Sequence, residues 1–302
     1  MDWRALSQEI IRLKREKNAV LLVHNYQQEE IQLLADFLGD SLDLSRKASQ
    51  VPESTIVFCG VLFMAETAKI LSPDKKVLIP RLDASCPMAE SMDVAGLKAL
   101  KSQHPDAMVV TYVNSTAEVK AESDVCCTSA NAIKVVEKVE AGEIIFAPDR
   151  NLAHWVQRFT KKRIIPWDGF CYVHQRFSPD EVRKARDTHP EALLIAHPEC
   201  IPEIIDMADQ VLSTSGMVRF ARESDTHTLL VATEEGLIRR LQRENPGKKF
   251  FSAGTAKTCR GMKTIHLEDV HQSLALGQYE VVVPARVAGR ARKAVERMLE
   301  YV

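Results

Sequence analysis

Three of the seven cysteines recur at nearly equal spacing, and their thiols are the first candidates for chemistry in this sequence. Cys86, Cys171 and Cys259 are separated by 85 and 88 residues, and each lies just before a helix-like stretch. A single cysteine in a reducing compartment is usually a small buried hydrophobe. Three cysteines at equivalent positions favour a shared metal site instead.

Three thiolates select soft metals, which leaves zinc, copper(I) and iron–sulfur clusters as alternatives. None of the three cysteines forms a Cys-x-x-Cys pair, so the usual spacings of zinc ribbons and ferredoxins are absent. A zinc ion on three cysteines and one water is one alternative. An iron–sulfur cluster on three cysteines keeps one iron open as a Lewis acid, which favours non-redox catalysis. The cysteines that do not recur are interpreted as structural: Cys59, Cys126, Cys127 and Cys200.

Three sets of polar residues share this period. The first set ends strand-like runs (His24, Tyr112 and His197), the second follows two residues later (Tyr26, Asn114 and Glu199), and the third begins helix-like segments (Ser41, Ser129 and Thr214). Hydroxyls and free N–H groups at helix starts bind carboxylates or phosphates. A histidine close to a carboxylate can transfer protons. Together the sets predict a site for an anionic, oxygen-rich substrate.

All these residues belong to an internal repeat, which is most evident in residues 21–41, 109–129 and 193–214. Each copy has a strand-like run, a polar turn, an amphipathic stretch and an aspartate (Asp36, Asp124 and Asp209). Second strand-like runs end at Cys59, Ala147 and Ala232, each 35 residues after the leading residue of its copy. A partial fourth copy follows, with the strand-like run 280–284 and Ala285 in the leading position.

The alternation of strands and helices predicts parallel sheets covered by helices on both faces, repeated three times. We predict an α/β fold of three pseudo-threefold-related αβα domains, each with a small parallel sheet, around a central cavity. The predicted domains are 1–85, 86–170 and 171–279, with the C-terminal segment 280–302 packed near the first. Because ligands lie beyond the carboxyl ends of parallel strands, the three rims and the three cysteines are expected to converge. The helix-like segments 3–17 and 288–301 are expected to pack near one another.

Composition excludes several other classes of protein. Forty Lys+Arg against 41 Asp+Glu give a net charge of −1, which predicts neither a nucleic-acid binder nor a membrane-surface binder. No apolar run approaches the roughly 18 residues of a membrane span, and the N-terminus lacks the apolar region of a signal peptide. An odd number of scattered cysteines argues against a disulfide scaffold, so we expect a reducing cytoplasm.

Short motifs from about residue 18 to the last strand-like run resemble those of the quinolinate synthase family. In chain order they are HNYQ (24–27), GDS (39–41), MAETAKIL (64–71), CPMA (86–89), YVNS (112–115), TSANA (128–132), GFCYVH (169–174), HPEC (197–200), STSGM (213–217) and CRGMK (259–263). Because the motifs are many and dispersed, the resemblance covers nearly the whole chain.

The resemblance implies that iminoaspartate condenses with dihydroxyacetone phosphate to give quinolinate, phosphate and water, on the de novo route to NAD. It implies a [4Fe–4S] cluster on Cys86, Cys171 and Cys259, with an open iron that engages the substrate. It also implies that an aspartate oxidase or dehydrogenase supplies the imine. The residues that would line the substrate site are His24, Ser41, Tyr112, Asn114, Ser129, His197, Glu199 and Thr214. Tyr26 and Glu199 would be the acid–base pair, with His197 orienting Glu199.

Two other classes of protein remain as alternatives at this point. An iron–sulfur carrier or electron-transfer protein would have a fourth protein ligand and no substrate. A mononuclear zinc hydrolase would contain zinc without sulfide. His174, Met262 and Lys263, which lie near the cysteines in sequence, are expected to pack around the metal without a chemical role.

Overall fold

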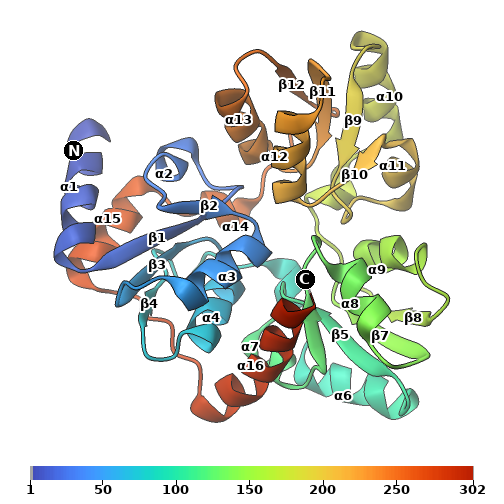
Figure 1. The fold of residues 1–302 in the computed structure, drawn as a ribbon, viewed down its shortest axis with the longest axis horizontal. Helices are drawn as coiled ribbons and strands as arrows, with labels where there is room; N and C mark the ends of the chain where they lie inside the picture. The colour runs from blue at the N-terminus through green and yellow to red at the C-terminus, as the bar shows by residue number, and fades with distance from the viewer. Residues whose placement is uncertain (1–2, 302) are drawn as a thin grey trace.

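The computed structural model describes residues 3–301, and its strands form three four-stranded sheets in which all strands are parallel (Figure 1). The strand orders are β2-β1-β3-β4, β6-β5-β7-β8 and β10-β9-β11-β12, so each sheet has the same topology. Helices flank each sheet, and the three units surround a common centre (Figure 1). The predicted α/β class with three repeated αβα units is confirmed.

The first unit contains the following elements in chain order: α1 (Trp3–Glu16), β1 (Ala19–His24), α2 (Glu29–Gln32), β2 (Phe37–Gly39), α3 (Ser41–Gln50), β3 (Thr55–Cys59), α4 (Leu62–Leu71), β4 (Lys76–Leu78) and α5 (Pro87–Glu90). The second contains α6 (Val94–Gln103), β5 (Met108–Tyr112), α7 (Ala117–Ala121), β6 (Val125–Cys127), α8 (Ala132–Lys138), β7 (Glu143–Ala147), α9 (Arg150–Gln157), β8 (Arg163–Pro166) and the 3₁₀ turn η1 (His174–Arg176).

The third unit and the C-terminal segment contain α10 (Pro179–Thr188), β9 (Leu193–Ala196), α11 (Pro202–Met207), β10 (Gln210–Val211), α12 (Thr214–Glu223), β11 (Thr228–Ala232), α13 (Glu235–Glu244), β12 (Lys249–Ser252), α14 (Arg260–Lys263), α15 (Leu267–Leu276) and α16 (Ala285–Glu300). Among residues 3–301, no helix is both long and apolar enough to cross a membrane.

The two inner strands of each sheet are apolar because helices cover both of their faces. In β1 every residue is buried, and in β11 likewise. The second strand-like runs form β3, β7 and β11, which end at Cys59, Ala147 and Ala232 as predicted. The leading residues His24 and Tyr112 end β1 and β5, and His197 follows directly after β9. The repeat therefore brings the polar residues to the same edge of each sheet.

The recurrent aspartate aligns the edge strand with the central strand in each unit. Asp36, Asp124 and Asp209 stand directly before β2, β6 and β10. Their carboxylates accept hydrogen bonds at 2.8, 2.7 and 2.7 Å from the backbone N–H groups of Leu21, Val109 and Leu194 in the central strands. Each aspartate N–H donates to the carbonyl of the same central-strand residue. One side chain thus sets the register of the first strand pair.

We expect Asp124→Ala to lower the free energy of unfolding by about 1–3 kcal/mol, because it removes a charged acceptor and leaves the buried Val109 N–H unpaired. Urea unfolding measures the change. The exposed Asp225 provides a control, and Asp225→Ala should stay within about 0.5 kcal/mol of the parent. Equal losses in the two variants would show that Asp124 does not hold the register.

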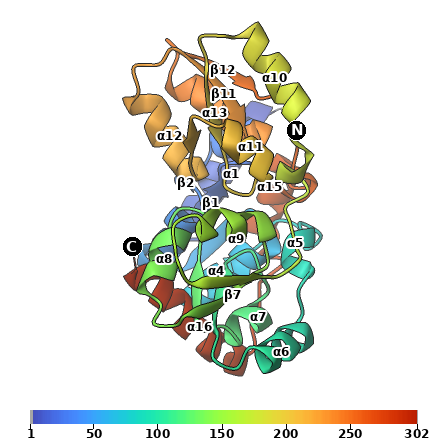
Figure 2. The same ribbon diagram turned by 90° about the vertical axis from the view of Figure 1, so that its right-hand side faces the viewer.

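The C-terminal part of the chain differs from the prediction. The run 280–284 is not a strand, since it makes only an isolated bridge between Glu280 and Leu78. The helices α1 and α16 do not pack together, because α1 packs against α15 and α16 against α7, β6 and α4. Both views show α16 beside α7 (Figures 1 and 2). Segment 280–302 therefore contacts the second unit as well as the first, and its last residue lies outside the described range. The domain bounds 1–85, 86–170 and 171–279 stay a prediction.

Candidate active site

In each unit a main-chain hydrogen bond joins the segment before the recurrent cysteine to the start of the helix that follows β3, β7 or β11. The carbonyls two residues before the cysteines belong to Ala84, Gly169 and Lys257. They accept hydrogen bonds at 2.9, 2.8 and 3.0 Å from the first N–H groups of α4, α9 and α13, which belong to Leu62, Arg150 and Glu235. Because the bond is the same in all three units, the cysteines occupy equivalent places at the rim.

A single helical turn follows each cysteine. The carbonyls of Cys86, Cys171 and Cys259 accept hydrogen bonds at 3.1, 2.9 and 3.0 Å from the N–H groups of Glu90, Gln175 and Lys263, four residues later. Burial raises the pKa of Cys86 to about 12 and raises the pKa of the other two thiols, while an N–H group three residues later opposes the rise at each sulfur. Without a metal these thiols therefore keep their protons, and a metal that binds them must displace the protons, because it ligates only the thiolate.

The three rims enclose one small cavity of about 60 Å³. Its walls contain all three recurrent cysteines and every polar residue predicted for the site: His24, Tyr26, Ser41, Tyr112, Asn114, Ser129, His197, Glu199 and Thr214. The apolar remainder of the wall is Val61, Phe63, Met64, Met88 and Met262. Most of the residues that line this small cavity are buried, and a site with little water strengthens the polar contacts inside it.

His24 and His197 present the same nitrogen to the cavity. In each, Nδ1 accepts a hydrogen bond from the N–H group two residues later, at 3.2 Å from Tyr26 and 3.3 Å from Glu199. Burial lowers the pKa of both histidines to about 3, so both are neutral at pH 7. With Nδ1 accepting, the hydrogen of each ring is on Nε2, and in His197 this atom lies 3.2 Å from the Ser129 hydroxyl. Both rings can therefore donate to an anionic ligand.

A chain of short buried polar contacts joins Tyr26 to Glu199 through residues from all three units. The Tyr26 hydroxyl lies 2.6 Å from Oγ1 of Thr233, which lies 2.8 Å from Nε2 of His174. Nδ1 of His174 lies 2.7 Å from one carboxylate oxygen of Glu199, an ionic contact rather than a hydrogen bond, and the Tyr112 hydroxyl donates to the other oxygen at 2.5 Å. A hydroxyl, an imidazole and a carboxylate in this order can move a proton in either direction.

The environment separates the proton affinities of Tyr26 and Glu199. Burial and the charge of Glu199 raise the pKa of Tyr26 well above its usual range, so the phenol keeps its proton. Burial alone would raise the pKa of Glu199, but the neighbouring His197 and His174 and the hydrogen bond from Tyr112 outweigh it and lower the pKa. One group is thus a proton donor and the other a carboxylate that can accept a proton.

Sequence reasoning missed two members of this chain. His174 was expected only to pack near the metal, yet its ring makes the short contact with the Glu199 carboxylate. His197 lies 3.9 Å from that carboxylate and instead accepts the N–H group of Glu199. Thr233 directly follows β11, but its equivalents Gly60 and Pro148 carry no hydroxyl, so the repeat gave no signal for it.

Two of the three predicted helix starts are correct. Ser41 and Thr214 are the first residues of α3 and α12, but the residues before them, Asp40 and Ser213, cap these helices. The hydroxyls of Ser41 and Thr214 are thus free of the capping role. Ser129 does not begin a helix, because α8 begins three residues later, after Asn131.

Two groups of side chains could hold a metal. Among residues 3–301, Cys171, His174 and Glu199 have ligand atoms that all lie within 4.8 Å of one another, whereas the three cysteines do not form so tight a set. Nε2 of His174 is bonded to Thr233 and its Nδ1 lies 2.7 Å from the Glu199 carboxylate, so this group is better explained as a proton-transfer network. The three cysteines are partly exposed toward the cavity, while Cys59, Cys126, Cys127 and Cys200 are buried, in agreement with a structural role. The donor set at the cavity is therefore three thiols, one from each unit, which suits a soft metal group.

Comparison with known proteins assigns the chain to a family. The family described as "Quinolinate synthetase A protein" matches residues 8–300. The chain belongs to the quinolinate synthetase A family. Its relatives include a protein named quinolinate synthase from Methanoregula boonei, 51% identical over 298 residues, with 99% of each chain covered. Proteins with the same name from Pyrococcus horikoshii and Thermodesulfovibrio yellowstonii are 52% and 50% identical, with 98% of each chain covered.

The match to the quinolinate synthetase A family takes in all three units and every residue that lines the cavity. The whole site described above thus lies within the part of the chain that the family shares.

Proposed function

We propose that this chain is a quinolinate synthase, which condenses iminoaspartate with dihydroxyacetone phosphate in de novo NAD biosynthesis. The observation that carries the proposal is the cavity in which one thiol from each unit meets a buried phenol–carboxylate pair, in a chain of this family. The reaction balances without an oxidant: one carbon–carbon and one carbon–nitrogen bond form, and one phosphate and two waters leave. It needs groups that donate and accept protons next to a skeleton held by its carboxylates.

We propose that Cys86, Cys171 and Cys259 hold a [4Fe–4S] cluster. Ligands of a single zinc ion lie about 2.3 Å from the metal, so three sulfurs on one ion would be about 4 Å apart. The three sulfurs do not all lie within 4.8 Å of one another, which favours a polynuclear group over a single ion. When bound, such a cluster supplies an open iron that acts as a Lewis acid toward a carbonyl or hydroxyl.

The polar residues of the cavity would bind the substrates. His24 and His197 would donate from Nε2 to carboxylate or phosphate oxygens, and Ser41, Ser129 and Thr214 would donate from their hydroxyls. Oδ1 of Asn114 is buried and has no hydrogen-bond partner among residues 3–301, so it is available for an N–H or O–H of a substrate. Tyr112 would hold the Glu199 carboxylate in place.

Glu199 would take protons from the carbon skeleton and Tyr26 would give protons to the departing oxygens. The short contacts through His174 and Thr233 would then return a proton from Glu199 to Tyr26. This cycle leaves both groups as they began. The same proposal retains an aspartate oxidase or dehydrogenase as the source of the imine and a reducing cytoplasm as the compartment.

Anaerobic turnover of the purified protein tests the function. With iminoaspartate generated in place and dihydroxyacetone phosphate added, we expect quinolinate and phosphate in equal amounts. Adding quinolinate alone should change the spectrum of the metal group, because a ligand reaches the open iron. An iron–sulfur carrier would give no product and no spectral change, and zinc without sulfide would indicate the hydrolase. Either result would reject the proposal.

A further inference from the structure

Two main-chain carbonyls in the site are held by side chains from a neighbouring unit. The carbonyl of Glu199 accepts a hydrogen bond at 3.0 Å from Nδ2 of Asn151, and the carbonyl of Tyr26 accepts one from the ammonium of Lys263. Tyr26 and Glu199 occupy the same position in the repeat, two residues after the leading histidine. Each bond therefore fixes the main chain from which one member of the proposed acid–base pair extends.

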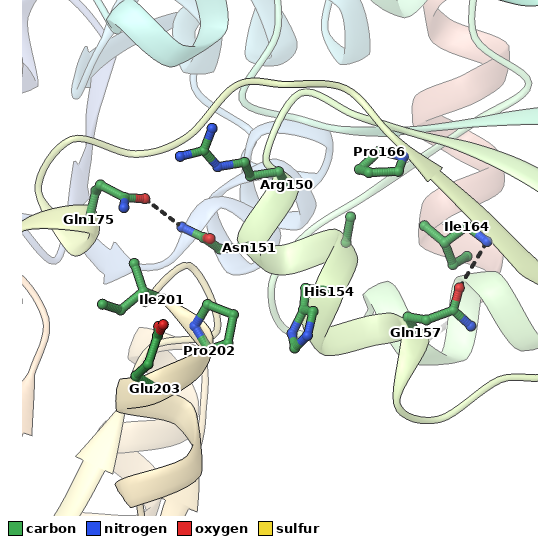
Figure 3. A pocket seen from close by; sticks show the side chains of 11 residues that line it. Arg150, Asn151, His154, Gln157, Ile164, Pro166, Gln175, Ile201, Pro202 and Glu203 are labelled. Atoms are coloured by element: carbon green, nitrogen blue, oxygen red, sulfur yellow. Dashed lines mark hydrogen bonds between the residues drawn. The ribbon is translucent and has the colours of Figure 1, made fainter. Parts of the chain in front are cut away.

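Both donors are also tied to a cysteine loop, which is the segment from a recurrent cysteine to the fourth residue after it (171–175 and 259–263). Asn151 donates to Oε1 of Gln175 at 3.1 Å, on the wall of an open cleft between α9 and the start of α11 (Figure 3). The N–H of Gln175 in turn donates to the Cys171 carbonyl at 2.9 Å. The N–H of Lys263 donates directly to the Cys259 carbonyl at 3.0 Å. Gln175 and Lys263 are equivalent, since each lies four residues after its cysteine.

A buried acidic side chain also binds each of these two cysteine loops. Asp149 lies two residues after β7 and Glu234 two residues after β11, and both are fully buried. Each accepts a hydrogen bond at 3.1 Å from the N–H group of the cysteine, Asp149 from Cys171 and Glu234 from Cys259. Glu234 also pairs with the ammonium of Lys263 at 3.1 Å. In both units the N–H group of the cysteine thus donates to the buried side chain, and the carbonyl of the cysteine accepts from the residue four positions later.

Gly236 explains why the two donors come from different positions. It is the equivalent of Asn151, and a Cβ atom there would lie 2.7 Å from Nζ of Lys263 and 3.0 Å from the Tyr26 carbonyl. Without a side chain at Gly236, Lys263 can reach that carbonyl. Between the second and third units, Asn151 occupies the equivalent position and donates directly to the Glu199 carbonyl. In the first unit the position holds Phe63, whose side chain cannot donate.

We propose that Asn151 and Lys263 are positioning residues, which couple the cysteine loops of the second and third units to Glu199 and Tyr26 of the next unit. The inference rests on the proposed function, because it assigns the coupling to that acid–base pair. Neither residue transfers protons. Each acts through the main chain, and a small shift of a reacting group is enough to slow a reaction substantially.

Steady-state kinetics provide the first test. Asn151→Leu keeps the size without the donor, Lys263→Met removes the ammonium, and Gly236→Ala displaces it with one methyl group. We expect each to lower kcat at least tenfold, with KM changed less than threefold and the iron content unchanged, and Lys263→Arg to recover part of the loss. The controls are His154→Leu, exposed one turn further along α9, and Lys249→Met, exposed on β12; both should keep kcat. A parental kcat in Asn151→Leu or Lys263→Met would overturn the proposal.

Amide hydrogen exchange provides a test that needs no turnover. In the parent protein, removing iron anaerobically with bipyridyl should speed exchange in residues 24–27 and 197–200. Asn151→Leu should exchange faster in 197–200 alone before iron is removed, and Lys263→Met in 24–27 alone, with little further change afterwards. Exchange that does not respond to iron removal in the parent would overturn the coupling even in an active enzyme. Coupled exchange in a protein that makes no quinolinate would reject the proposed function instead.

Discussion

Replacing Cys86, Cys171 or Cys259 by serine is expected to remove both the iron–sulfur group and the synthesis of quinolinate. Each cysteine comes from a different unit, and no other thiol lines the cavity among residues 3–301. A serine hydroxyl does not ionise near neutral pH and is a poor ligand for soft metals. Each variant should therefore contain little iron and sulfide and have less than about 1% of the parental turnover. Iron and sulfide analysis, the visible spectrum and quinolinate production measure this.

Cys126→Ala is the matched control, because Cys126 is buried in β6 and the change removes a thiol without touching the cavity. It should keep the metal group and the turnover. A full complement of iron and sulfide in any of the three serine variants would reject the ligand set. Loss of metal in Cys126→Ala as well would show that general destabilisation explains the result.

The periodic part of the site could be predicted from the sequence because parallel sheets of one topology repeat their geometry. A residue at a fixed distance after a strand reaches the same edge of each sheet, so equal spacing of Cys86, Cys171 and Cys259 was enough to predict that they converge. His24 and His197 illustrate the same point, since their hydrogen bonds are the same in the two units. The aspartates of the repeat are also explained, because each has the same role in its sheet.

The parts that could not be predicted are those in which one unit departs from the repeat. Thr233 has glycine and proline as equivalents, and His174 has no counterpart that would mark it, yet both join Tyr26 to Glu199. The helix α15 has the sequence position of α6 and α10, but it packs against α1 and β3 and so joins the end of the chain to its beginning. Contacts between units depend on how the sheets are arranged in space, which the spacing of residues within a unit does not encode.

Glu199→Gln is expected to keep the metal group and to lose ring formation. The amide has nearly the size of the carboxylate and can still accept the hydrogen bond from Tyr112, so the wall of the cavity should be preserved. An amide cannot accept a proton from the substrate, and the return path to Tyr26 through His174 and Thr233 is broken at its first step. General acid–base catalysis contributes about 10²- to 10⁴-fold, so kcat should fall by about that factor.

The comparison of iron content with turnover decides the role of Glu199. The matched control is Glu203→Gln, because Glu203 is an exposed carboxylate on the same unit, four residues further along the chain. It makes the same chemical change away from the cavity and should keep both iron and turnover. Undiminished turnover in Glu199→Gln would remove Glu199 from the mechanism, whereas loss of iron would assign it to holding the metal. Only full iron with slow turnover agrees with a base that returns its proton to the partner acid, Tyr26, through the buried contacts of His174 and Thr233.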